Sequence, residues 1–151
     1  MLVGSRDGRL RFYDRLGSNA KNLIPSLHGD EIKHIDLSQD GRLALATCES
    51  YLLLFSTFQN QKSSFSFQFK KANKPKPKVL KIHPEMLFKL GVNTPQFRKA
   101  KFDFVRDSRE QLIVAFGNNL VAIWKLSDVF NHHFSTRLVS KMDERIIGGD
   151  F

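Results

Sequence analysis

The residues best suited to chemistry are lysines gathered near the middle of the chain, namely Lys70, Lys71, Lys74, Lys76, Lys78 and Lys81. Pro75 and Pro77 hold the backbone between them extended, so the ammonium groups project outward. Phe65, Phe67 and Phe69 precede the run. Three interpretations are open: a solvated loop, a surface for an acidic protein or lipid head group, and a site for single-stranded nucleic acid, which needs both phosphate contacts and stacking rings.

The spacing of the three phenylalanines bears on that choice. A period of two predicts that their rings point together into a sheet, which leaves the lysines alone in solvent. Nucleic acid is therefore the least favoured partner, and an anionic membrane surface stays open.

Acids that could act in catalysis stand instead at turns. Asp7, Asp40 and Asp107 each lie between strand-like runs, where a carboxylate accepts hydrogen bonds from nearby backbone N–H groups. The sequence shows neither a paired acid and base, nor a glycine-rich phosphate loop, nor a Ser/His/Asp set at a familiar spacing. We expect no enzyme and no cofactor.

Histidine and cysteine give no metal or nucleophile site. His34 alternates with apolar neighbours and is expected in solvent or at a sheet edge. The side chains of His132 and His133 diverge because the two residues are adjacent, and Asp128 is the only acid near them. Cys48 lies in an apolar run and is expected as a small buried side chain. A single cysteine forms no internal disulfide and fits a reducing compartment, so we expect a cytoplasmic protein.

Composition predicts one soluble domain. The chain has 151 residues, of which 41% are hydrophobic, and this is enough for a sizeable core. No apolar run approaches the roughly 20 residues of a membrane-spanning helix, and the first residues lack the layout of a secretory signal. Lys and Arg exceed Asp and Glu by 24 to 15, a net charge of +9 that attracts phosphates, acidic proteins or anionic membranes without naming one.

The elements that would position these residues repeat along the chain. The stretch RDGRLRFYD aligns with CESYLLLFS, which places Phe55 on Tyr13 at an offset of 42 residues. This offset falls within the roughly 40 to 45 residues of a WD-repeat propeller blade. A third copy, residues 97 to 126, ends in GNNLVAIWKL and places Trp124 at the same position. The larger second offset of 69 residues locates an insert of Ser, Phe, Lys and Pro at residues 59 to 78, a long connection with a short strand of its own.

The predicted fold is all-β: a partial β-propeller of WD-repeat type, with about three four-stranded antiparallel blades in a single domain over residues 1 to 151. The pairs Asp7-Gly8 and Asp40-Gly41 mark turns between strands. The opening copy matches the middle strands of a blade whose innermost strand is missing. Residues 137 to 151 match an outer strand followed by the start of another blade. For residues 83 to 91 two readings are open, a short helix begun by Pro84 and ended by Gly91, or a strand over MLFKL.

Two stretches, RLGSNAKNLIPSLHGD and KPKPKVLKIHPE, are absent from generic WD repeats. Together with DGRLRFYD, GNNLVAIWKL and RIIGGDF they resemble the C-terminal propeller domain of the vacuolar import and degradation protein twenty-seven family. The resemblance implies a cytoplasmic, non-enzymatic domain linked to protein trafficking or turnover at the vacuole. The Trp-Asp ending of a repeat reads here as Tyr13-Asp14, Phe55-Ser56 and Trp124-Lys125, so only the first copy keeps the acid.

The resemblance to a WD repeat also places His28 in the Gly-His region. There an imidazole can bridge the outer turn to a neighbouring strand, and we expect this structural role.

Two functions follow as hypotheses. The first is a protein-interaction scaffold, because propellers present loops on a rigid frame and need no reactive group. The second is a charge-driven binder of phosphates, on nucleic acid or membrane, through the lysine-rich insert; its affinity would fall steeply with salt. A three-blade piece leaves two uncovered sheet faces and unpaired edges, so we also expect it to self-associate.

Overall fold

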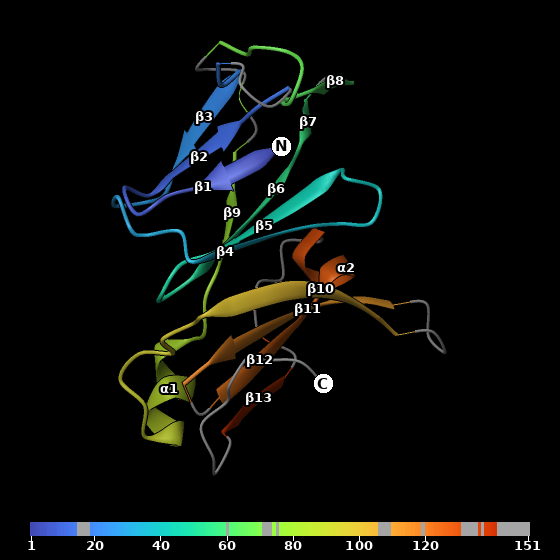
Figure 1. The fold of residues 1–151 in the computed structure, drawn as a ribbon. Helices are drawn as coiled ribbons and strands as arrows, with labels where there is room; N and C mark the ends of the chain where they lie inside the picture. The colour runs from blue at the N-terminus through green and yellow to red at the C-terminus, as the bar shows by residue number, and fades with distance from the viewer. Residues whose placement is uncertain are drawn as a thin grey trace.

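The computed structural model describes residues 1–14, 19–59, 61–70, 74, 76–105, 110–118, 120–130, 136 and 138–141. Its β-sheets are stacked face to face (Figure 1). The expectations that concern Lys71, Asp107, His132 and His133, and most of those on residues 137 to 151, lie outside the described residues.

Three antiparallel sheets account for the repeat. The first sheet runs β1-β2-β3, with strands Leu2–Gly4, Arg9–Phe12 and Asn22–Pro25. The second runs β4-β5-β6-β9, with strands His34–Leu37, Leu43–Thr47, Leu52–Ser56 and Lys78–Leu80. The third runs β10-β11-β12-β13, with strands Lys99–Val105, Glu110–Gly117, Leu120–Lys125 and Leu138–Lys141.

Each sheet is an antiparallel meander, as in one propeller blade, and in the second sheet an insert separates the neighbouring strands β6 and β9. The prediction of an all-β, partial WD-repeat-like propeller is confirmed. The first blade has three described strands, β1 to β3, and these correspond to the second, third and fourth strands of the other two blades.

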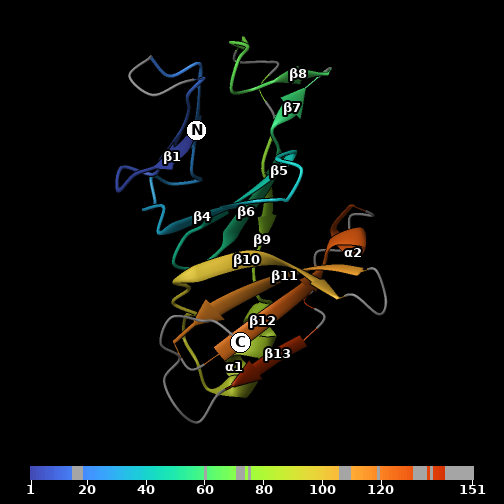
Figure 2. The ribbon, with the colours of Figure 1, turned by 45° about the vertical axis from the view of Figure 1, so that its right-hand side comes forward.

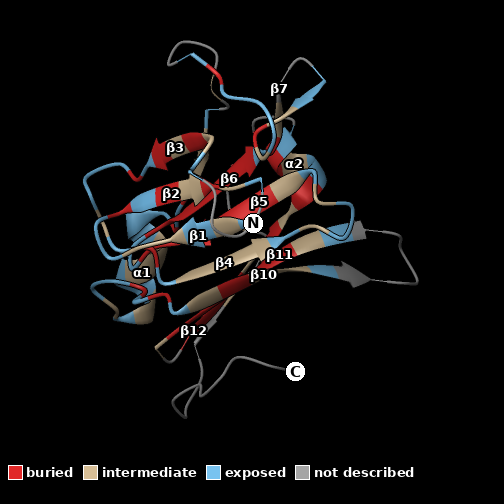
Figure 3. Ribbon diagram, turned by 45° about the horizontal axis from the view of Figure 1, so that its top comes forward, coloured by how far each residue is buried: buried red, intermediate tan, exposed pale blue. Residues whose placement is uncertain are grey.

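Apolar side chains fill the two spaces between the three blades. Between the first and second blades lie, among others, Leu10, Phe12, Ile24, Leu53 and Phe55. Between the second and third lie, among others, Leu45, Leu52, Leu54, Leu80, Ile113 and Trp124. Strand β6 therefore contributes to both cores, with alternate residues on opposite faces, and this explains its unbroken apolar sequence. Figure 3 shows its buried residues within the stack.

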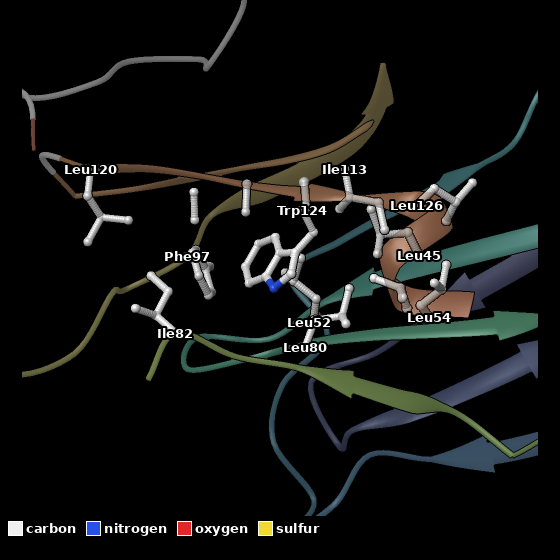
Figure 4. Packing of buried hydrophobic residues seen from close by; sticks show 14 residues of the cluster. Leu45, Leu52, Leu54, Leu80, Ile82, Phe97, Ile113, Leu120, Trp124 and Leu126 are labelled. Atoms are coloured by element: carbon white, nitrogen blue, oxygen red, sulfur yellow. The ribbon is translucent and has the colours of Figure 1, made fainter. Parts of the chain in front are cut away.

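The aromatic residues that mark the repeat occupy related places. Phe55 packs edge-on against Phe12 of the blade before it, with ring centroids 5.8 Å apart. Trp124, fully buried, also faces the preceding blade, and its ring lies 6.3 Å from that of Phe97 (Figure 4). Alternation along the strand places Tyr13, which is half-buried, on the face opposite Phe12, where this chain has no described sheet. The common direction of the three side chains supports the repeat alignment.

The insert leaves the second blade after β6 and then returns to it. It forms a short hairpin, β7 (Phe58–Gln59) and β8 (Lys62–Ser63), and crosses to the first blade before entering β9. Its anchor there is Asn22 of β3, which is 3% exposed. The Asn22 amide donates to the carbonyl oxygens of Ser64 at 2.6 Å and Phe67 at 2.7 Å, and its oxygen accepts from the N–H of Phe69 at 3.0 Å.

Two short helices complete the fold. Helix α1 (Pro84–Leu90) confirms the first of the two readings: Pro84 occupies its first turn, and Gly91 ends it in the left-handed conformation at φ 70°. Helix α2 (Leu126–Phe130) follows β12 directly. The two helices lie at opposite ends of β12 (Figures 1 and 2). Neither of them is long enough to cross a membrane, and the described part of the chain contains no other helix.

Candidate functional site: a basic face across two blades

The acids in the Asp-Gly turns hold their own backbone. Both turns have the pattern Ser-x-Asp-Gly-Arg. In the second, Asp40 accepts from the hydroxyl of Ser38 at 2.7 Å and from the N–H of Arg42 at 3.1 Å. In the first, Asp7 accepts from the Ser5 hydroxyl and the Arg9 N–H, and from the Arg11 guanidinium at 3.1 Å.

These hydrogen bonds lower the pKa of both carboxyl groups. The Ser5 hydroxyl and then Arg11 lower the pKa of Asp7, and the Ser38 hydroxyl and the Arg42 N–H lower the pKa of Asp40. Both side chains are ionised, exposed and committed to turn geometry, so neither is arranged as a general acid.

The bridge expected of His28 is made by other residues. His28 is exposed and forms no hydrogen bond to any described residue. Instead the Tyr51 hydroxyl, from the second blade, donates to the Asp30 carboxylate at 2.7 Å and accepts from the Leu27 N–H at 3.2 Å. Burial and the bond to Asp30 raise the pKa of Tyr51. Next to it, burial raises the pKa of the Cys48 thiol to about 11, which leaves a protonated, unreactive side chain.

Contacts between the inner strands join the second and third blades. The Asp36 carboxylate of β4 accepts from the Phe102 N–H of β10 at 2.9 Å. His34, on the same strand, is half-buried, and burial followed by the charge of Lys99 lowers the pKa of its imidazole. Among the described residues no group of three or more His, Cys, Asp or Glu could hold a metal ion.

The structure disperses the lysine run. Lys70 is exposed. The Lys74 ammonium donates to the carbonyl oxygen of Leu23 at 3.0 Å and so helps to fasten the insert to the first blade. Lys81 lies beside α1, in a groove of about 530 Å³ that Glu85 and Lys89 also line. The lysines of this run are therefore separated in the structure. Lys74 has a structural role, Lys81 lies beside α1, and Lys70 is exposed.

Lys76 and Lys78 remain together. They line a hollow of about 210 Å³ with Leu43, Leu54, Phe55, Ser56 and Phe130. The Lys78 ammonium lies 5.3 Å from the centre of the Phe130 ring, which is 48% exposed. Because Phe130 belongs to α2, the hollow lies between the second and third blades. Sequence reasoning missed Phe130, since a five-residue helix is too short to show a period.

The insert phenylalanines do not all point inward. Phe65 packs on Phe12 with ring centroids 5.2 Å apart, and Phe69 is buried. Phe67 is 39% exposed and carries the Lys62 ammonium 4.1 Å above its ring. The expectation of three inward rings therefore fails for Phe67, because the chain has left the sheet before this residue and the alternation of a strand no longer applies.

The stacked meanders, their common aromatic positions and the turn-bound acids define the chain as a WD-repeat-like β-propeller segment. The family model described as the VID27 C-terminal WD40-like domain matches residues 1–151. The chain belongs to this family, as its sequence resemblance indicates.

Two relatives carry the same name, "Vacuolar import and degradation protein 27". The Schizosaccharomyces pombe protein is 31% identical over 159 aligned residues, which take in 100% of this chain and 20% of the relative. The Saccharomyces cerevisiae protein is 38% identical over 139 residues, 87% of this chain and 18% of the relative. The chain therefore spans about a fifth of the length of these relatives.

Proposed function

We propose that this chain is a non-enzymatic, cytoplasmic interaction scaffold that binds an acidic protein surface in vacuolar import and protein degradation or trafficking. The name shared by the two relatives supports the choice of this process. WD40-like domains as a class generally act by binding and not by catalysis.

The observation that carries the proposal is a concentration of cations on one side of the stack. The β4–β5 turn, the β7–β8 hairpin and α2 lie on the right-hand side of Figures 1 and 2. The cations on these elements and on the residues that lead directly into β9 are Arg42, Lys62, Lys76 and Lys78. Exposed rings of Phe67 and Phe130 stand among them. Cations with aromatic side chains suit a protein partner that supplies carboxylates and apolar contacts.

Binding of phosphates is the second candidate. The lysine-rich insert favours it through charge. Two observations weigh against it: Lys74 is occupied by a backbone carbonyl, and Phe65 and Phe69 pack against the protein, where no base can stack on them. A phosphate binder would hold vesicles of phosphatidylcholine and phosphatidylserine at low salt and release them steeply as salt rises.

Charge reversal on this side tests the scaffold. The first variant carries Lys62→Glu, Lys76→Glu and Lys78→Glu, and a matched control carries Lys33→Glu, Lys81→Glu and Lys89→Glu, which change the net charge equally on other elements. Each protein is fused to a proximity-labelling enzyme in fungal cells. We expect the first variant to lose neighbours that the control keeps. Equal loss in both, or loss in neither, would refute the proposed face, and vesicle binding that depends on the same three lysines would favour the phosphate binder.

A further inference from the structure

We propose that the hollow formed by Lys76, Lys78 and Phe130 is a specificity pocket that takes one apolar side chain flanked by a carboxylate. This inference rests on the proposed scaffold function, because it names the partner segment that the basic face would recognise. The segment is an acidic peptide stretch in which a Leu or Phe stands next to Asp or Glu.

One part of the lining of the hollow is apolar. Leu43 and Leu54 form an apolar floor from the second blade, and Phe130 adds an exposed ring from the third. A bare phosphate gains nothing from such a floor, whereas an aliphatic or aromatic side chain loses its contact with water there. The floor therefore selects a partner with an apolar group.

The volume limits what can enter. At about 210 Å³ the hollow is smaller than the roughly 300 to 1,000 Å³ that cofactor and drug-sized pockets have. It suits a single large side chain, with the rest of the peptide lying across the neighbouring surface.

The lysines supply the second half of the recognition. Lys76 is exposed, and neither it nor Lys78 has a carboxylate within ion-pair distance among the described residues. The contact with Phe130 holds the Lys78 ammonium beside the hollow. The Ser56 hydroxyl is already paired with the backbone of Phe58, so the two ammonium groups are the donors left for an incoming anion. Apolar walls strengthen an ion pair formed beside them, because they lower the local dielectric constant.

The test uses NMR titration of the whole chain with synthetic peptides. The probe is a blocked peptide in which Leu and Phe alternate with Asp. One comparison peptide replaces the apolar residues with Ser, and another replaces Asp with Asn. We expect the mixed probe to bind about tenfold or more tightly than either comparison peptide, with shifts at the ends of β6 and β9 and in α2.

Protein variants then show which residues cause the preference for the mixed probe. Lys76→Gln with Lys78→Gln, and separately Phe130→Ser, should each remove most of the preference for the mixed probe. The control, Lys62→Gln with Lys70→Gln, removes the same charge from other parts of the insert and should keep the preference. Unchanged thermal unfolding shows that a variant is folded, and Lys76→Gln alone serves if the double variant is not.

Three results would overturn the pocket, and the first two of them leave the scaffold standing. One is equal affinity for the mixed probe and the Ser-containing peptide, which would mean diffuse attraction to charge. The other is an equal loss in the control variant, which would place recognition elsewhere on the insert. Binding of inorganic phosphate that competes fully with the mixed probe would also overturn it, because the apolar floor would then contribute nothing.

Discussion

At the scale of single residues, two glycines in the same turn motif differ in how much the fold depends on them. Gly8 and Gly41 both follow an aspartate and adopt left-handed φ angles of 77° and 73°. A Cβ atom at Gly8 would overlap the Ser26 hydroxyl and the backbone of Gly29 and Asp30. At Gly41 it would meet nothing within 4 Å. Backbone strain is thus shared by both positions, and steric overlap belongs to Gly8 alone.

We expect Gly41→Ala to cost about 1 kcal/mol, which is the strain of a left-handed alanine. Gly8→Ala should cost at least about 2 kcal/mol more, because the neighbouring loop must move. Urea unfolding curves followed by circular dichroism measure both, and each variant serves as the other's control. Equal losses would show that the loop around Ser26 adapts to the added methyl group.

The sequence predicts that both glycines lie in turns, because Asp-Gly between apolar runs has few other conformations. It does not predict their surroundings. The first turn joins β1 to β2, the second and third strands of a blade, whereas the second joins β4 to β5, the first and second strands of the next. The atoms around Gly8 come from the β3–β4 connection, and local pattern carries no information about them.

At the scale of elements, the insert depends on one buried side chain. The Asn22 side chain forms hydrogen bonds with three backbone groups of the insert. Because it is buried, water cannot take its place. Asn22→Ala should lower the free energy of unfolding by about 2 to 4 kcal/mol, since it leaves buried groups unpaired. The same variant should speed proteolysis within residues 64 to 78.

Asn93→Ala is the control for this change, because Asn93 is exposed and its replacement should stay within about 0.5 kcal/mol. Denaturant titration and timed trypsin digestion give the two readouts. A loss confined to proteolytic resistance, with unchanged global stability, would show that the insert unfolds independently of the blades.

The sequence predicts the insert's presence and not its path. The larger offset between the second and third repeats locates the extra residues, since the blade period is nearly fixed. The partners of Asn22 stand 42 to 47 residues away, and a lone asparagine in an apolar strand does not indicate them. The same limit hides Phe130, because the hollow that it completes depends on how two blades meet.

At the scale of the whole molecule, the two outer blades each present a face that no described blade covers. On the first blade this face carries Val3, 38% exposed, and the half-buried Arg11. On the third lies a separate apolar cluster of Val114, Phe116, Val121, Leu112 and Ile123, of which the first three are at most 8% exposed, so the open face is that of the first blade. Sheet faces of this kind are covered by another blade within a propeller.

We therefore expect the 17.4 kDa chain to self-associate as its concentration rises, with a mass above that of one chain by light scattering. Val3→Lys should shift the equilibrium toward the monomer, because it adds a charge beside Arg11 on the uncovered face. The control is Phe88→Ser, which removes an 86% exposed ring from α1 and should leave the mass unchanged. A monomer at every concentration would contradict the expectation.

The repeat can be predicted from the sequence because each blade has the same strand order and an aromatic residue at the same position. Phe55 and Trp124 are recognisable because the third strand of a blade buries alternate residues against the blade before it, and Tyr13 stands at the matching position of the first blade. The sequence does not predict that the cations gather on one side. This arrangement depends on which connections lie at the same end of different blades. Lys74 and Lys81 leave that group for reasons that appear only in three dimensions.

The route of the insert restricts how this protein can evolve. Blades arise by duplication and are exchanged between proteins as interchangeable modules when each makes only generic contacts with its neighbours. Here the segment between β6 and β9 is fastened to Asn22 and Leu23 of the previous blade. A gene rearrangement that copied or deleted the second blade alone would separate this segment from the residues that hold it. These two blades should therefore be inherited as a pair.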